Sequence, residues 1–463
     1  MQYLEKTIQY LTFLFLFLLP WQTILLLQER FVNGAKWEYG TLGVFATEVL
    51  GWMIVLLFMV WYVARLRTTD YRLRTFSLSK DRLFVLSLLL FSLYSLILSF
   101  FVGDTFVAFQ HTRRILLGSL LFLFFYSGPV KGKNALWAFI LGSIPVSVLG
   151  IWQFLSQATV ASTVLGLSSY IVHEPGASII ASESIGRWLR AYGSFSHPNV
   201  FGGYLALTIF SSLLLYRSSV GWGRVVVHAI IVLQSTALFF TFSRSAFLAV
   251  FFGLVVYVIS MFPPLFKGSL PAGQAGVREG LSEVRRPPLG IHLGKGERLA
   301  KLLLAFSIIF AFCIFSFAFF PLVQTRFTAT SQNEVVSITE RVAGYEQAVD
   351  IFLQHPLFGV GGGNYTYALM QAFPGMPGWW YQPVHSVPLL FVVEVGLVGV
   401  ALLVFVLVSF VRLQTIDYRQ YVLLITGYVP LLLLDHYLWS SYVGLMLIAV
   451  FFGLFFQNKN NEV

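Results

Sequence analysis

The chain has 463 residues, of which 57% are hydrophobic and only 11% are charged, and its mean hydropathy is +0.78. A soluble globular protein carries about 25% charged residues, so this composition excludes a soluble domain. The formal net charge of +10 is better explained by basic loops that follow the positive-inside rule than by nucleic-acid binding. The single cysteine excludes an internal disulfide.

Apolar runs of about 20 residues, each long enough to cross a hydrocarbon layer of roughly 30 Å, recur along the chain. They predict an all-α polytopic membrane protein with about twelve transmembrane helices. The first run lacks a small-residue cleavage site, so we expect it to be retained. The predicted spans are 8–28, 41–64, 83–102, 113–127, 135–157, 199–216, 225–242, 245–263, 300–320, 386–411, 421–434 and 437–456.

The distribution of lysine and arginine predicts that both termini are cytoplasmic. The loops 65–82 and 264–299 supply most of the basic residues on that side. The second of these is rich in Gly, Pro and charge, and we interpret it as a flexible cytoplasmic insertion without catalytic residues.

Two long segments, 158–198 and 321–385, fall on the external side. In the second, Ser-Ile-Thr-Glu at 337–340 has the form of a capping box and predicts a helix that begins at Ser337. Its end is expected near Gln354, because Pro356 disfavours helix at the residue before it. One side of this helix is apolar, which predicts an amphipathic helix on the external membrane surface. The apolar residues are Val342, Val349, Phe352 and Leu353.

External basic residues are the main functional signal, because membrane proteins usually carry few on that side. Arg244 lies in a tight turn, where a guanidinium would bind phosphate, or alternatively reach lipid headgroups. Arg341 is expected near a helix N-terminus, where a bound anion would offset its unfavourable position, or alternatively pair with Glu340 or Glu346. The nine residues are Arg30, Lys36, Arg113, Arg114, Arg187, Arg190, Arg244, Arg326 and Arg341.

Histidines are the candidates for a proton acceptor, since their pKa lies near neutrality. His385 ends the long external segment, and a structural role is its alternative. Competing candidates are His197, His355 and His436. Asp435 precedes His436 and either orients it or forms a polar turn, and Asn199 is equally a helix cap. Aromatic residues at 379–381 either stack on a sugar or form an interfacial belt.

Several catalytic motifs are absent from the sequence: there is no Walker motif, zinc-protease helix or nucleophile elbow. The external aspartates are widely separated in the sequence, so we expect neither a metal nor another cofactor. An enzyme of this kind would use arginine cations instead.

In this order and on one side of the membrane, these motifs resemble the O-antigen ligase and polymerase superfamily of bacterial membrane glycosyltransferases. The resemblance covers roughly 185–440, and the N-terminal spans match only in hydropathy. The motifs are Arg190-Ala-Tyr-Gly-Ser-Phe-Ser-His-Pro-Asn199, Ser243-Arg244-Ser245, Glu340-Arg341, His355-Pro-Leu-Phe-Gly-Val-Gly361, His385-Ser386, Glu394-Val-Gly396 and Asp435-His436-Tyr437.

The resemblance implies a GT-C-like fold with a large periplasmic loop, in the inner membrane of a bacterium. It implies transfer of a glycan from an undecaprenyl diphosphate carrier to an acceptor hydroxyl, with inversion and without metal. The site would face the periplasm, and the acceptor would be a lipid or glycan such as lipid A-core, as in lipopolysaccharide biosynthesis.

The resemblance also assigns catalytic roles to His385, Arg341 and Arg244, with Arg190 as a further candidate on the diphosphate side. Ser386 stands where the family often has Asn, so no side-chain amide is expected there. Further substrate-binding candidates are His197, Asn199, Asp435 and His436.

We expect residues 1–184 to form N-terminal transmembrane helices and 185–456 the catalytic region. The sequence does not select the acceptor, so a polysaccharide polymerase and a protein O-oligosaccharyltransferase stay open beside a ligase. A lipid-linked glycan flippase is the alternative of another class. It would need charged residues deep in its spans, where Glu48 is the main example.

Overall fold

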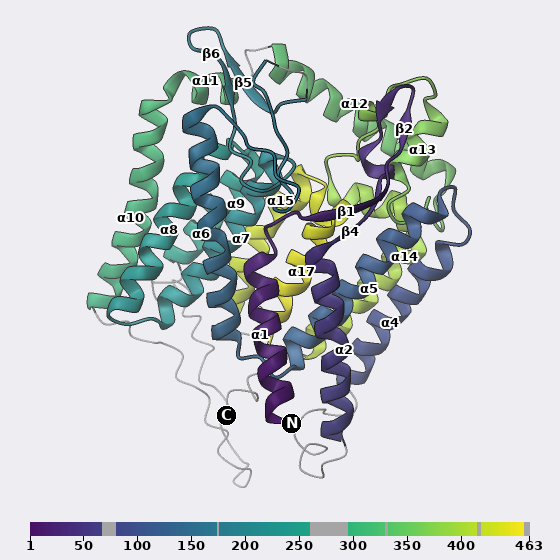
Figure 1. The fold of residues 1–463 in the computed structure, drawn as a ribbon, viewed down its shortest axis with the longest axis horizontal. Helices are drawn as coiled ribbons and strands as arrows, with labels where there is room; N and C mark the ends of the chain where they lie inside the picture. The colour runs from purple at the N-terminus through teal and green to yellow at the C-terminus, as the bar shows by residue number, and fades with distance from the viewer. Residues whose placement is uncertain (67–79, 174–175, 260–294, 329–331, 414–417, 458–463) are drawn as a thin grey trace, which may run out of the picture.

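The computed structural model describes residues 1–66, 80–173, 176–259, 295–328, 332–413 and 418–457. In these ranges the protein is a bundle of long helices, with short hairpins and surface helices gathered at one end (Figure 1). The N-terminus lies at the opposite end of the bundle (Figure 1). Most of both predicted cytoplasmic loops lies outside the described residues.

In the part of the chain that the structure describes, a helix lies at each of the twelve predicted spans. Five are long and apolar enough to cross a membrane, or six if α10 and the bent α11 that follows count as one span. The chain is therefore a mostly helical polytopic protein, and the number twelve stays a prediction. The helices are α1 (Gln2–Leu18), α2 (Ala46–Leu66), α4 (Lys80–Leu98), α5 (Thr105–Ser127), α6 (Gly132–Ser156), α7 (Pro198–Ser218), α8 (Trp222–Thr241), α9 (Arg244–Ile259), α10 (Lys295–Ala318), α14 (Val387–Leu413), α15 (Tyr418–Leu434) and α17 (Tyr442–Phe455).

The predicted bounds of the first two spans are wrong where the chain forms a hairpin instead. α1 ends at Leu18, because Pro20 disfavours helix at the residue before it. The apolar residues that follow form β1 (Ile24–Gln28), which pairs antiparallel with β4 (Leu42–Phe45) ahead of α2. Between them lie β2 (Phe31–Val32), β3 (Ala35–Lys36) and η1 (Glu38–Gly40). We call residues 24–45 the N-terminal hairpin.

Two of the arginines predicted to lie outside, Arg113 and Arg114, are instead inside α5. The Arg113 Nε donates to Glu48 Oε1 at 2.8 Å, and both arginines donate to the carbonyl of Gly43 in β4 at 3.3 Å. The Gly43 N–H also donates a hydrogen bond to Gln110 Oε1 at 2.8 Å. These contacts fasten the N-terminal hairpin to α5.

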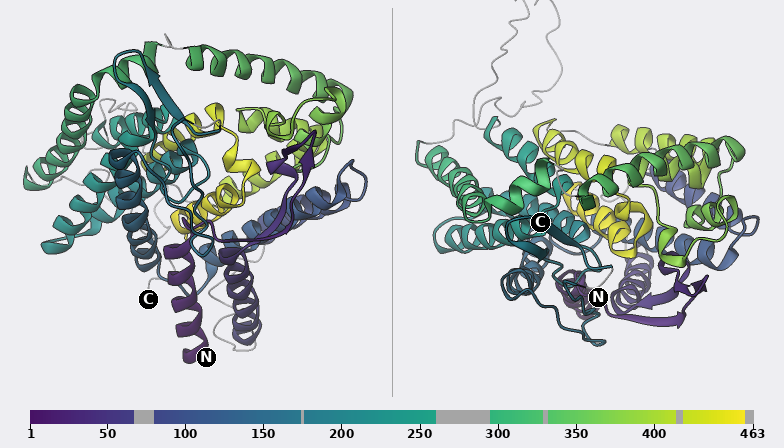
Figure 2. Two further views of the ribbon diagram at one scale, coloured as in Figure 1. Left: turned by 45° about the horizontal axis from the view of Figure 1, so that its top comes forward. Right: turned by 90° about the horizontal axis from the view of Figure 1, so that it is seen from above.

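The segment 321–385 contains α11 (Phe320–Thr328), α12 (Gln332–Gln354), α13 (Tyr365–Ala372) and η2 (Gly378–Trp380). The predicted helix end at Gln354 is confirmed, but the predicted start at Ser337 is wrong. No Pro or Gly interrupts residues 332–336, so the helix extends through the apparent capping box. α12 crosses the end of the bundle roughly perpendicular to α1 (Figure 2). Its predicted apolar side is largely exposed at Val342, Val349 and Leu353.

A break in α14 receives the glycine-rich chain that follows α12. Gly396 has φ 64°, and the backbone of residues 356–361 runs alongside it. The Val360 N–H donates to Val393 O and the Leu397 N–H to Pro356 O. The glycine-rich segment therefore docks against α14.

We predict that Gly396→Ala destabilises the protein. A Cβ there would lie 2.3 Å from the Leu357 carbonyl oxygen, and a left-handed backbone costs a non-glycine residue roughly 1–2 kcal/mol even without a clash. The matched control is Gly344→Ala in α12, where a Cβ meets nothing within 4 Å. Thermal unfolding in detergent should show a lower midpoint for Gly396→Ala alone, and equal midpoints would contradict this account.

Candidate active site

The site is built on the first turn of α7, a helix with nearly all its residues buried. His197 caps this helix, since its Nδ1 accepts a hydrogen bond from the Asn199 N–H at 3.1 Å. Pro198 occupies the first helical position, where its missing N–H is harmless. The sequence His-Pro-Asn therefore fixes where α7 begins and directs His197 and Asn199 beyond its end.

Arg190 ties this turn to its neighbours, at the end of the hairpin β5 (Ile179–Ser182) and β6 (Gly186–Leu189). Its Nε donates to Thr241 O at 2.7 Å, Nη1 to Ser178 Oγ at 2.8 Å and Nη2 to Asn199 Oδ1 at 2.7 Å. Arg190 is 3% exposed. Protein acceptors thus engage all three nitrogens, and the side chain holds Asn199 in place.

Asp435 continues this hydrogen-bond network between α15 and α16 (Tyr437–Ser440). Its Oδ1 accepts from Asn199 Nδ2 at 3.0 Å, and its Oδ2 accepts from the Ser245 hydroxyl. Burial raises the pKa of Asp435, although the hydrogen bond from Ser245, the charge of Arg341 and the bond from Asn199 oppose this. The network joins the first turns of α7 and α9 to the start of α16.

Three histidines come together beside this network. The His385 and His436 rings meet edge to face, with centroids 5.1 Å apart. The His436 Nδ1 is 2.7 Å from Ser440 Oγ, and His197 accepts from the backbone as described. No residue in the described part of the chain hydrogen-bonds a ring nitrogen of His385. His385 therefore differs from the other two in having both ring nitrogens without a hydrogen-bond partner among the described residues.

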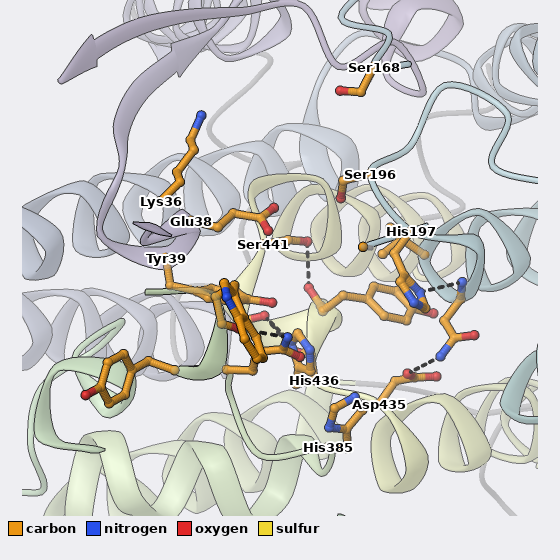
Figure 3. A pocket seen from close by; sticks show the side chains of 18 of the residues that line it. Lys36, Glu38, Tyr39, Ser168, Ser196, His197, His385, Asp435, His436 and Ser441 are labelled. Carbon is orange, nitrogen blue, oxygen red and sulfur yellow. Dashed lines mark hydrogen bonds between the residues drawn. The ribbon is translucent and has the colours of Figure 1, made fainter. Parts of the chain in front are cut away.

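Two cavities, of about 590 and 340 Å³, open at this end of the bundle. Figure 3 shows the larger one, with the three histidines and Asp435 on one side and Glu38 of the N-terminal hairpin projecting toward it. Both cavities are of the size that binds small ligands. The residues that line both are His197, Trp379, Gln382 and His385.

The smaller cavity is lined by Arg341 of α12 together with Glu340 and His385, so it offers a guanidinium beside a carboxylate and an imidazole. The ion pairs considered from sequence, with Glu340 or Glu346, are not formed, and none of the described carboxylates pairs with this guanidinium. We predicted that Arg341 lies near the N-terminus of this helix. The helix begins at Gln332, so that prediction is wrong. The charge of Arg341 nevertheless acts on His385 and Asp435.

Two other arginines flank the turn between α8 and α9. Arg326 is buried, and its Nε donates to Phe242 O at 3.2 Å. Arg244 is the first residue of α9 and half-buried, beside the Ser245 that binds Asp435. Arg244 is not among the residues that line the two cavities.

The predicted site residues therefore divide into two groups. Six surround the cavities, while Arg190 and Arg244 lie behind or beside their walls. The six are His197, Asn199, Arg341, His385, Asp435 and His436.

Sequence reasoning missed the N-terminal contribution to the larger cavity. Lys36, Glu38 and Tyr39 line it from the hairpin, and Tyr170 lines it from the segment before β5. The sequence signal was the charged and aromatic cluster Lys-Trp-Glu-Tyr at 36–39, which lies between the first two predicted spans and of which only Lys36 was considered.

His385 is poised as a neutral imidazole. Burial, and then the charge of Arg341, lower its pKa to about 4. Burial and nearby positive groups also hold the pKa values of His197 and His436 well below the ordinary value. At pH 7 His385 is therefore unprotonated and has a free position for a proton.

Comparison with known families gives one finding for this chain. Residues 229–404 match a family model described as O-Antigen ligase, a range that includes Arg244, Arg341 and His385. A search of curated proteins found no match. The match indicates a membrane enzyme of the glycosyltransferase type and confirms the resemblance drawn from sequence.

We predict that Arg341→Gln raises the pKa of His385 by on the order of one unit, because a nearby cation disfavours imidazolium. Arg341→Lys is the control and should leave it near 4, since it keeps the charge. Histidine-selective NMR titration, with the His385 signal assigned by His385→Gln, would measure both. An unchanged value in Arg341→Gln would show that burial alone depresses it.

Proposed function

We propose that this chain transfers a glycan from an undecaprenyl diphosphate carrier to an acceptor hydroxyl, and the match of residues 229–404 to the O-Antigen ligase family model supports this proposal. The reaction inverts the anomeric centre and uses no metal. We further propose that the site faces the periplasm from a bacterial inner membrane, with both termini cytoplasmic.

One observation carries this proposal: the open imidazole of His385 borders two cavities, and the cation Arg341 lines the smaller one with it. Arg341 has no ion-pair partner among the described carboxylates, and His385 has no hydrogen bond on its ring nitrogens from the described residues. An unpaired arginine suits a diphosphate, which takes bidentate hydrogen bonds. A free imidazole suits a hydroxyl that must lose its proton.

The proposed chemistry is a single displacement at the anomeric carbon. His385 takes the proton of the acceptor hydroxyl while the hydroxyl oxygen attacks the face opposite the leaving group. The bond between the anomeric carbon and the phosphate oxygen breaks, and its electron pair leaves with the diphosphate. Arg341 stabilises this growing negative charge, and Arg244 at the start of α9 is the second cation that we propose.

The buried residues around this centre then act by positioning. Arg190 orients Asn199, and Asn199 together with Ser245 fixes Asp435. Asp435 precedes His436, whose ring packs on His385. We therefore revise the expected role of Arg190 from substrate contact to support of the imidazole pair.

A bound diphosphate would also make His385 a stronger base. In the free protein Arg341 contributes to its low pKa. An anion on Arg341 offsets that charge, so the pKa of His385 rises toward neutrality when the donor binds. The pKa of His385 then lies near the working pH only when the donor is bound.

We predict that His385→Ala lowers the transfer rate by about 10²–10⁴-fold, the usual contribution of a general base. The control is His355→Ala, because His355 is exposed and lines neither of the two cavities. Purified protein, carrier-linked glycan and acceptor would be assayed in detergent after checking monodispersity. Full activity of a well-folded His385→Ala protein would refute the base assignment.

The same assay separates a transferase from a flippase, since a flippase forms no glycosidic bond in detergent. The mid-span charges that a transporter would need are paired here, because Glu48 binds Arg113 of α5.

Cells that lack the chain distinguish the three enzyme roles by mass spectrometry. Polymer left on the carrier indicates a ligase, single repeat units indicate a polymerase, and unglycosylated protein indicates a protein O-oligosaccharyltransferase. We favour the ligase, the activity named by the matched family.

A further inference from the structure

The larger cavity has a carboxylate that the proposed chemistry does not use. Glu38 of η1 lines this cavity and is exposed to it. No hydrogen bond or ion pair joins its carboxylate to the described residues. The neighbouring Lys36 is paired with Glu29 instead. The carboxylate is therefore available to accept hydrogen bonds from a ligand in the cavity.

An aromatic ring also borders the same cavity. Trp379 of η2 is 63% exposed and borders both cavities. In the described part of the chain its indole makes no ring contact, unlike Trp380, which packs on Tyr381. A large exposed indole beside a polar group suits a ligand with one apolar and one hydroxylated face.

The two residues are held in fixed relation. Trp37 Nε1 donates to Thr366 Oγ1 at 3.3 Å, and Asn33 Nδ2 donates to Met376 O at 2.7 Å. Gly378, beside Trp379, lies so close to the hairpin that a Cβ there would be 2.4 Å from Ala35 O. The N-terminal hairpin and η2 thus form one rigid wall, and the contacts of Arg113 and Arg114 with β4 fasten its far side.

Both cavities carry mixed charge, since Lys36 and Glu38 line the larger one and Glu340 and Arg341 line the smaller one. Lys36 is paired with Glu29, whereas none of the described carboxylates pairs with Arg341, so the donor phosphates are assigned to Arg341 in the smaller cavity. His385 borders both cavities and can reach a hydroxyl from the larger one. The larger cavity is therefore left for the acceptor.

Building on the proposed transfer reaction, we propose that Glu38 and Trp379 form an acceptor-sugar subsite. The Glu38 carboxylate accepts hydrogen bonds from hydroxyls of the terminal acceptor sugar, and the Trp379 indole covers its apolar face. The acceptor is then a carbohydrate hydroxyl and not a serine or threonine of a protein. A site that binds specific hydroxyls discriminates strongly against analogues that lack them.

Saturation-transfer NMR on the purified full chain tests this without relying on turnover. The probes are the methyl glycosides of glucose, galactose and N-acetylglucosamine, and a Ser/Thr hexapeptide. We expect wild type to bind at least one glycoside and not the peptide. Glu38→Ala and Trp379→Ala should abolish the signal, Glu38→Gln should restore part of it, and Glu183→Gln, on the exposed β5–β6 turn, should leave it unchanged.

A deoxy series of the bound glycoside sharpens the test. We expect one deoxy glycoside to bind wild type more weakly than the parent glycoside. In Glu38→Gln, which keeps part of the binding, the difference between the same two glycosides should be smaller. Equal glycoside binding by wild type and both alanine variants would overturn the subsite, as would peptide binding alone.

Kinetics separate this inference from the proposed function. With a lipid-linked oligosaccharide acceptor, Glu38→Ala should raise the acceptor KM by about tenfold to a hundredfold, the loss expected for a hydrogen bond to a charged group, while the donor KM stays constant. Transfer with an unchanged acceptor KM would overturn the subsite and leave the transferase standing. Absence of transfer by wild type would count against the proposed function, and glycoside binding would still decide the subsite.

Discussion

The candidate site depends on a buried chain of hydrogen bonds from Arg190 through Asn199 and Asp435 to Ser245. Each member lies at the end of a different helix or loop, so the chain fixes the relative position of those ends. A buried polar network is stable only when its members are satisfied, and each link here has a partner. Loss of one link would leave a buried charge or amide unpaired, which costs several kcal/mol.

A second set of contacts fixes the positions of His385 and His436. Glu394 in α14 accepts from the Tyr365 N–H and from Trp439 Nε1 in α16, while the chain after α12 docks in the break at Gly396. His385 lies just before the first turn of α14, and His436 lies just before α16. The two imidazoles therefore meet because α13, α14 and α16 are tied together away from the cavities.

The arrangement places one imidazole between two cavities. Arg341 and Glu38 line different cavities, and His385 borders both. In the reaction that we propose, a phosphate-bearing donor and a hydroxyl-bearing acceptor approach this imidazole from two sides. The proposed acceptor side includes the N-terminal hairpin, which lies outside the matched residues 229–404, so both halves of the chain line the candidate site.

The sequence by itself determined the helical membrane class, the superfamily and the end of α12 at Gln354, because hydropathy, ordered motifs and proline effects are local in the chain. It did not determine the hairpin at 24–45, since an aliphatic strand and a span edge have the same hydropathy, nor the start of α12. Only the tertiary structure decided that Arg190 is engaged by protein acceptors, that Arg341 has no carboxylate partner among the described residues, and that Glu38 and His385 line the same cavity. Those properties arise from contacts between residues far apart in sequence, which no local pattern encodes.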